Sequence, residues 1–292
     1  MNPDRNDKIV RGIICIILSG LCFSLMNVAI RTAGDIPSMQ KCVFRNSIAL
    51  IIAIGYMVKG RIPVMSDKGN GWLLLGRAVC GTIGVLGNYY AVDHMNIGDA
   101  SIMNKISPFV ALCCAAIFLK ERFTWVHLIA VAGAFAGCVF VVQPSPDLAQ
   151  MTPFMIALAG GIGAGFALTF LRALGRREEN STRVIFWFSA VSTLITVPFL
   201  FFNAVPISLN QWISMLLAGL LAAAGQVFIT RAYYYAAPRN ISVFDFSQVL
   251  FSALFGFLFF SEIPGGTSVI GYILIISMGV LLFFYNKRRQ PE

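Results

Sequence analysis

The sequence predicts an all-α membrane protein of ten transmembrane helices, arranged as two inverted five-helix repeats. Three observations carry this prediction: an apolar composition, ten apolar segments of spanning length, and an internal repeat. Hydrophobic residues make up 58% of the 292 positions and charged residues only 12%, whereas soluble domains have about 25% charged residues. A soluble fold of this length has too little interior for so much apolar surface, so we expect a multi-pass membrane protein.

Ten segments are long and apolar enough to cross a bilayer, whose core of about 30 Å requires roughly 20 residues per helix. They cover residues 10–30, 37–58, 72–92, 98–119, 124–142, 152–171, 184–202, 211–231, 240–260 and 267–285. The first is longer than the apolar core of about 7–15 residues in a signal peptide, so we expect a span and not a cleaved leader. The connections are short, which leaves no room for a soluble domain between the spans.

The distribution of basic residues predicts the orientation. With the N-terminus inside, the cytoplasmic loops hold 17 Lys and Arg residues and the outer loops hold two. Cytoplasmic loops are enriched in this way, so we expect both termini in the cytoplasm and the chain in the plasma (inner) membrane. The basic residues lie at the ends of apolar runs and form no patch interleaved with aromatics, which argues against nucleic acid as a partner.

An ungapped shift of 141 residues aligns the first five spans with the next five; Gly20, for example, meets Gly161. Five is an odd number, so the second copy enters the membrane upside down. We therefore expect two repeats, at 9–142 and 151–285. Inverted repeats are typical of secondary transporters, which bind their substrate at the repeat interface near mid-membrane.

The fourth segment resembles the fourth helix of the drug/metabolite transporter superfamily, the EamA-type ten-helix exporters. The residues that carry the resemblance are Ala100, Ser101, Pro108, Leu119, Glu121, Arg122 and Thr124. The second copy keeps Ser242 and Glu262 but has Val249 in place of the proline. The resemblance implies secondary transport of small metabolites by alternating access. One branch of this superfamily includes S-adenosylmethionine importers and organic-anion carriers. The chain resembles that branch in Arg77 of the third span and in the stretches "GNYYAV" and "DASIMNKISPF".

Four charged residues lie in the interior of predicted spans, away from the first and last turn: Arg45, Arg77, Lys105 and Asp245. A charge at mid-membrane costs about 2.5–3.5 kcal/mol on insertion scales, so such residues usually face a cavity or a partner. Arg45 and Lys105 each lie about seven residues from the outer end of a helix, roughly 10 Å deep, and we expect them to flank one cavity. Arg77 lies closer to the cytoplasmic end, where snorkelling is the alternative.

The surplus of basic residues favours a substrate with a carboxylate or phosphate. Asp245, with Asn104, is a candidate to bind an amino group or to carry a proton. Pro108 removes one helical hydrogen bond near Asn104, and irregular backbone at this depth is tolerated where it lines a cavity. The 141-residue shift pairs Arg45 with Phe186. Trp187, the next residue, is a further candidate to line the cavity. A kinked packing helix with a snorkelling Lys105 is the alternative.

Other classes of protein fit poorly. A membrane enzyme would need a catalytic cluster, and the two histidines offer only His94 beside Asp93, with Asp99 nearby, and an isolated His127. No CxxC pair or P-loop occurs, so we expect no enzyme, no metal and no cofactor; a channel would need a pore lining that is not visible. A monomer would suffice, and a dimer is compatible.

We therefore predict a secondary transporter that moves a small polar metabolite, an organic anion or an amino acid-like solute, across the cytoplasmic membrane. An importer of S-adenosylmethionine or a similar nucleoside metabolite is the alternative. The bilayer and the solute are the expected partners, and protons are a candidate coupling ion.

Overall fold

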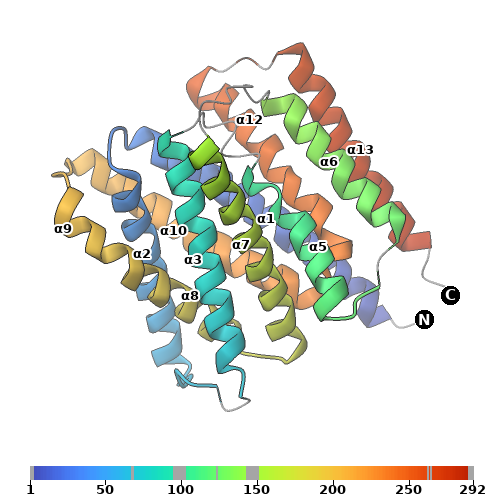
Figure 1. Cartoon of the computed structure of the whole chain (residues 1–292), viewed down its shortest axis with the longest axis horizontal. Helices are drawn as coiled ribbons and strands as arrows, with labels where there is room; N and C mark the ends of the chain where they lie inside the picture. Colours follow the sequence, from blue (N-terminus) through green and yellow to red (C-terminus); the bar gives the residue numbers. More distant parts are fainter. Residues whose placement is uncertain are drawn as a thin grey trace.

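The computed structural model describes residues 3–66, 69–94, 103–122, 124–142, 151–261, 263 and 265–288. Every regular element in these ranges is helical, and the long helices run side by side as one bundle (Figure 1). The two ends of the chain lie close together at one end of this bundle (Figure 1). Ala100, Ser101, Asp99 and Glu262, which the sequence singled out, lie outside the described residues.

The described residues of the first half form five helices. They are α1 (Pro3–Thr32), α2 (Ser38–Lys59), α3 (Gly71–His94), α5 (Ser107–Phe118) and α6 (Trp125–Val142). The second half contains α7 (Met151–Arg176), α8 (Ser181–Thr196) with the short η2 (Val197–Phe199) and α9 (Leu200–Asn203), α10 (Leu209–Tyr235), α11 (Pro238–Ile241), η3 (Ser242–Phe246), α12 (Ser247–Phe260) and α13 (Gly266–Arg288).

Seven helical stretches in the described residues are long and apolar enough to cross a membrane. They include α1, α2, α7, α10 and α13, the stretch from α8 to α9, and the stretch from α11 to α12. Helices α5 and α6 are apolar but shorter, and α3 carries Arg77 in its interior. The chain is thus a multi-pass membrane protein, and all ten predicted segments overlap a described helix.

Two predicted spans are interrupted in the structure. Helix α5 begins at Ser107, with Pro108 in its first turn, where the missing N–H of proline costs no helical hydrogen bond. In place of a kink within one continuous helix, which is the alternative interpretation of the sequence, the described residues show a helix start at this point. In the second half, the 3₁₀ stretch η3 precedes α12, so the counterpart of α5 is broken at the equivalent place.

Most of the helix packing is preserved when the two halves are exchanged. Helix α1 packs against α10 and α12, and its counterpart α7 packs against α3 and α5. Helix α2 packs against α10, and its counterpart α8 packs against α3. The remaining large contacts, α2 with α8 and α6 with α13, join counterparts directly. Each half therefore completes its packing with the helices of the other half.

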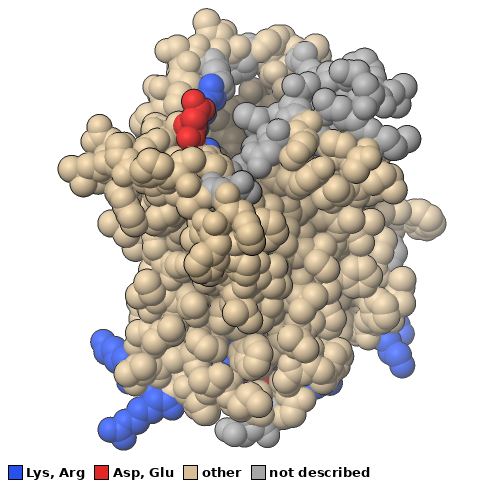
Figure 2. Space-filling view, turned by 60° about the vertical axis from the view of Figure 1, so that its left-hand side comes forward, with Lys and Arg blue, Asp and Glu red and all other residues tan. Residues whose placement is uncertain are grey.

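The surface of the bundle matches a membrane environment. Figure 2 shows a broad uncharged band around the middle of this face, with basic side chains projecting below it. Large apolar side chains such as Phe201, Leu194 and Ile213 are more than half exposed, and extensive exposed apolar surface marks a membrane contact. At the opposite end, the same view shows a hollow beside an acidic and a basic side chain.

Candidate functional site

The interrupted helices of the two halves meet at one ion pair. Lys105, in the turn before α5, places its Nζ 3.0 Å from Oδ2 of Asp245 in η3. The same Nζ also donates to the Asp245 carbonyl at 3.2 Å and to Oε1 of Gln248 at 2.8 Å. Lys105 is buried and Asp245 is half-buried, so charge and hydrogen bonds are satisfied mutually and not by solvent. The break in each helix thus supplies one member of the pair.

Helix α1 borders this pair. The Ser24 hydroxyl donates to the backbone carbonyl of Gln248 at 2.9 Å and lies 3.0 Å from the Ser252 hydroxyl. Since Gln248 also accepts from Lys105, a continuous polar connection runs from α1 through α12 to the segment before α5. The ion pair is therefore connected by hydrogen bonds to segments of both halves.

Glycines let the first helix of each half approach the interrupted segment of the other half. A side chain at Gly161 of α7 would collide with the carbonyl oxygen of Met103, just before Lys105. A Cβ at Gly20 of α1 would lie 3.2 Å from the backbone nitrogen of Gln248. These two glycines are the pair that the 141-residue shift aligns. The close approach is thus built in the same way on both sides of the site.

Two buried arginines form a second charged group. Arg77 on α3 donates from Nη2 to Oε1 of Gln226 at 3.2 Å, and its guanidinium lies 4.2 Å from the centre of the Phe188 ring. Arg45 on α2 lies 6.0 Å from the centre of the Phe23 ring and interacts electrostatically with Arg77. Neither arginine forms an ion pair with a carboxylate among the described residues. This group therefore carries uncompensated positive charge.

The arginines and the ion pair border the same stretch of α1. Ser19 donates to the carbonyl of Gly225 at 3.0 Å, one residue before the partner of Arg77. Phe23, which Arg45 faces, packs against the same Gly225, where a Cβ would lie 2.8 Å from the ring. Ser24, the next residue along α1, reaches Gln248 on the other side. Residues 19–24 of α1 thus lie between the two charged groups.

The sequence-predicted site residues are partly brought together. Arg45 and Arg77 are buried neighbours, and Lys105 pairs with Asp245. Asn104 is half-buried beside Lys105 in the chain.

Trp187 is placed elsewhere, because its Nε1 donates to the carbonyl of Val64 in the connection after α2 at 3.0 Å. The next residue, Phe188, lies on a different face of α8, and its ring faces the guanidinium of Arg77.

Sequence reasoning missed two polar residues of this region, Gln226 and Gln248. Both are uncharged and lie inside apolar segments, so a search for charges passed over them. Their signal was available, because an amide within a spanning helix needs a hydrogen-bond partner in its neighbourhood. In the structure that partner is a base in each case, Arg77 for Gln226 and Lys105 for Gln248.

Ionic contacts join the two halves at the end of the bundle where the chain begins and ends. Glu121, after α5, accepts from Nε of Arg172 on α7 at 2.8 Å. The same arginine donates from Nη1 to the carbonyls of Tyr233 and Tyr234, each at 3.3 Å. This guanidinium therefore links the ends of α5, α7 and α10.

A second cluster at this end surrounds the buried carboxylate of Glu179. It accepts from Arg183, from Ser66, from Asn70 at 2.7 Å and from the backbone of Asn180 at 3.1 Å. Burial alone would raise the pKa of the Glu179 carboxyl, but these hydrogen bonds outweigh it and hold the pKa below its ordinary value. Ser66 and Asn70 belong to the first half and Glu179 to the second, so this cluster also closes the bundle across the halves.

Comparison with known proteins agrees with this architecture. The model of the EamA-like transporter family matches twice, at residues 10–143 and 151–285. A solved crystal structure that is 14% identical superposes with a TM-score of 0.80 over 96% of this chain and 99% of that one, which shows a shared fold.

Three relatives illustrate the range of the similarity. The pseudopaline exporter CntI of Pseudomonas aeruginosa is 29% identical over 92% of this chain and 95% of its own length. A riboflavin transporter of Rhizobium johnstonii is 26% identical over 98% and 95%, and human solute carrier family 35 member G1 is 22% identical over 92% and 78%. With both halves matched by one family model, the chain belongs to the EamA-like transporter family.

Proposed function

We propose that this transporter moves a small polar metabolite with a carboxylate, an organic anion or an amino acid-like solute, by alternating access. The observation that carries the proposal is the Lys105–Asp245 pair at the two helix interruptions, close to two arginines without a carboxylate partner. Broken helices that meet between repeats are where transporters bind substrate and coupling ions. Three bases against one acid favour an anionic group on the solute.

An amino acid-like solute fits the pair in a specific way. A bound carboxylate replaces Asp245 as the partner of Lys105, and a bound amino group replaces Lys105 as the partner of Asp245. Interactions with the solute then offset the desolvation free energy of both charges, whereas a solute with a single charge would offset only one of them. When no solute is bound, the pair neutralises itself at 3.0 Å. Asp245 is also the acid that a proton would reach if proton binding drives transport.

The arrangement in the membrane follows from the same proposal. We infer ten spans in two inverted repeats, at 9–142 and 151–285, with both termini in the cytoplasm of the plasma (inner) membrane. The exchange symmetry of the helix packing supports the repeats, and the basic residues at one end of the bundle support the orientation. A monomer contains both halves of the site, so no second copy is required.

Alternating access requires contacts that open and close at each end. The Glu121–Arg172 pair and the Glu179 cluster join the halves at the proposed cytoplasmic end. At the other end the links between the halves include the paired hydrogen bonds between Gln40 and the backbone of Val205, at 2.9 and 3.0 Å, and the Arg31 guanidinium, which lies 4.1 Å from the centre of the Phe260 ring. We infer that the ionic contacts form a cytoplasmic gate, which is closed in this structure.

The relatives agree with a metabolite as cargo, since their names include an exporter and a riboflavin transporter. Direction is set by gradients and does not follow from the site. The rings of Phe23 and Phe188 beside the arginines suit a flat heterocycle, which keeps an S-adenosylmethionine-like solute as the second candidate. The two candidates differ in net charge, and the experiment below separates them.

The test is the melting temperature of the purified protein against a panel of anionic, zwitterionic and cationic metabolites. A solute at 100 times its Kd should stabilise by about 2.7 kcal/mol. We expect anions or zwitterions to stabilise the wild type and the control variant Lys59→Gln, which alters an exposed base at the end of α2. Lys105→Gln should lose the response. An equal response from Lys105→Gln, or stabilisation by cations alone, would refute the proposed substrate class.

Counterflow of the solute found in this way tests the mechanism. Reconstituted wild type should exchange labelled for unlabelled solute, whereas a channel would only let both equilibrate. Asp245→Asn tests coupling, because a pH gradient should no longer drive uptake if Asp245 carries the proton. Uptake that still follows the pH gradient in Asp245→Asn would assign the proton to another group.

A further inference from the structure

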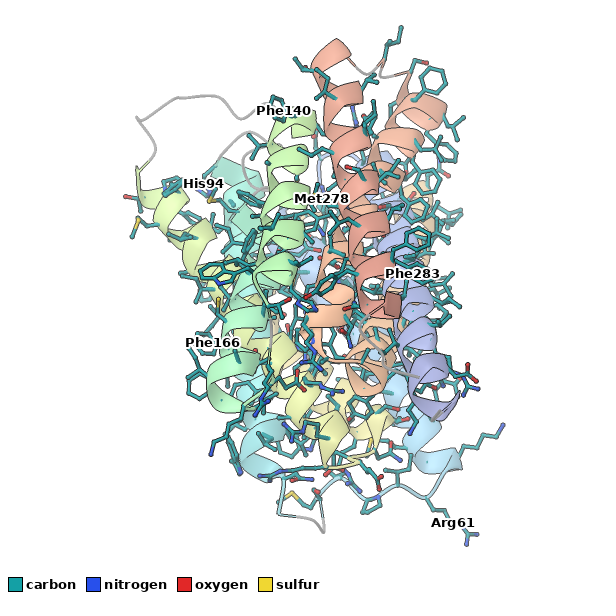
Figure 3. The ribbon with its side chains drawn as sticks, turned by 90° about the vertical axis from the view of Figure 1, so that its right-hand side faces the viewer. Arg61, His94, Phe140, Phe166, Met278 and Phe283 are labelled. Carbon is teal, nitrogen blue, oxygen red and sulfur yellow. The ribbon has the colours of Figure 1, made fainter. Side chains whose placement is uncertain are left out.

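A groove of about 660 Å³ opens on the side of the bundle between α3, α5 and α7. Its walls are aromatic: Trp72 meets Phe170 edge-on at 6.1 Å, and Phe118 lies 6.4 Å from Phe166. Trp72 and Phe118 are 61% and 66% exposed, and Figure 3 shows Phe166 on the outer surface of the bundle. The groove therefore faces the surroundings of the protein and not the substrate region.

One end of the groove is basic. Lys120, Arg176 and Arg177 line it, and all three side chains are exposed. Arg176 is oriented by a hydrogen bond to the carbonyl of Leu119 at 2.8 Å. Arg177 is oriented by a hydrogen bond to Asn70 at 2.9 Å and by the ring of Trp72. No carboxylate is among the described residues that line the groove, so its rim is positively charged.

We propose that this groove binds an anionic glycerophospholipid of the cytoplasmic leaflet. The acyl chains would lie on the aromatic walls, and the phosphate would be held by Lys120, Arg176 and Arg177. Basic pockets between transmembrane helices on the cytoplasmic side bind anionic headgroups, and each base near the surface contributes about 1 kcal/mol. The apolar wall suits the acyl chains of such a lipid, and the basic rim suits its phosphate. A free phosphate would use the rim and leave the walls empty.

Comparison with another groove of the bundle supports this choice. That groove, of about 260 Å³ against α2 and α8, has Arg61 as the one base among the described residues that line it. It thus offers an apolar surface without a cluster of charges, and any lipid can cover it. The larger groove combines its apolar wall with three bases, so selectivity for an anionic headgroup is expected there.

Binding at this place would also affect the conformational change. Lys120 follows α5 in the first half, and Arg176 ends α7 in the second half. A phosphate held between them bridges the halves beside the Glu121–Arg172 contact. An anionic lipid should therefore stabilise the conformation with the cytoplasmic end closed.

Native mass spectrometry of the purified full-length chain tests the proposal with three probes. They are dioleoylphosphatidylglycerol, dioleoylphosphatidylcholine with the same acyl chains, and soluble glycerol 3-phosphate. The variant Lys120→Gln/Arg176→Gln is compared with Lys8→Gln/Arg11→Gln, which removes two exposed bases of α1 from the same end of the bundle. Loss of two bases should weaken phosphatidylglycerol binding about thirtyfold, and the control pair should retain wild-type binding.

Trp72→Ala gives an independent test of the apolar wall. Because Trp72 is largely exposed, its truncation should leave the fold intact and weaken phosphatidylglycerol binding without altering the charge of the rim. Equal phosphatidylglycerol affinity in the Lys120/Arg176 variant and its control would overturn the proposal. So would equal binding of phosphatidylcholine, or full competition by glycerol 3-phosphate, which would mark the rim as a site for free phosphate.

Discussion

Removing one member of the Lys105–Asp245 pair should destabilise the protein more than removing both. The atoms are 3.0 Å apart, and the side chains are 10% and 15% exposed. At an effective dielectric constant of about 20, two charges at this distance attract by about 5.5 kcal/mol, and much of this offsets the desolvation of both groups. A single neutral variant gives up the attraction and leaves the other charge desolvated, at a cost of about 3–5 kcal/mol.

The measurement is a double-mutant cycle with Lys105→Met, Asp245→Asn and the double variant, followed by unfolding of the purified protein in a denaturing detergent. We expect each single variant to lose at least about 3 kcal/mol, and the double variant to lose less than either single variant, which requires a coupling free energy of at least about 3 kcal/mol. Lys59→Met, at the exposed end of α2, should change the unfolding free energy by less than about 0.5 kcal/mol.

The cycle refutes the reasoning if the two single effects add. Additivity would mean that Lys105 and Asp245 do not interact across the interrupted helices. Transport by the double variant then separates structure from function. A purely structural pair, once replaced by two neutral residues, should recover transport with stability. We expect stability to recover and transport to remain lost, because neither the carboxylate nor the amino group of the solute would find its partner.

Three further changes test neighbouring parts of the structure. Gly161→Ala places a Cβ against a backbone carbonyl and should lower the stability measured by thermal melting by about 1–3 kcal/mol. Nothing lies within 4 Å of a Cβ at Gly55, so the control variant Gly55→Ala should cost nothing. Glu179→Gln leaves Arg183 without its carboxylate and should cost about 1–3 kcal/mol. The pKa of Glu179 is lower in the folded state than in the unfolded chain. The stabilisation by its carboxylate is therefore complete at neutral pH and is lost as the pH falls below about 4.5. In Glu179→Gln, the acid side of a curve of stability against pH should be flatter than in the wild type. Arg77→Lys keeps the charge but loses the stacked, forked guanidinium, and solute affinity in the melting assay should fall about tenfold, while unchanged affinity would remove Arg77 from the site.

The fold was largely predictable because lipid imposes a simple rule on the chain. Backbone polar groups must be satisfied within each span, so apolar segments of about 20 residues become helices, and each predicted segment overlaps one. The interruptions were less predictable. Pro108 gave a signal in the first half, but the second half has Val249 at the aligned position and is interrupted as well. There η3 packs against α1, α5, α6 and α13, and no local sequence pattern records such contacts.

The site was predictable as a set of charges and not as a set of pairs. The cost of burying Arg45, Arg77, Lys105 and Asp245 in a membrane identified them, and the structure buries the three bases. Their partners depended on how the halves dock. The 141-residue shift aligned Asp245 with Asn104, whereas the contact joins it to Lys105. Repeat alignment names equivalent positions, and residues that touch across a pseudo-symmetry axis need not be equivalent in sequence number.

That difference bears on the choice of solute. Lys105 lies two residues before Ser107, where α5 begins, and Asp245 lies two residues before Ser247, where α12 begins. The two halves therefore present opposite charges from the same structural position. A site for a simple anion would gain from a base at both positions, and the acid at one of them would repel it. Opposite charges on opposite sides give the site a dipole, which a solute with a carboxylate at one end and an amino group at the other complements. If Asp245→Asn raises the affinity for a plain dicarboxylate and lowers it for the matching amino acid in the same melting assay, this dipole is the basis of selection; if both affinities change together, the acid serves only to hold Lys105.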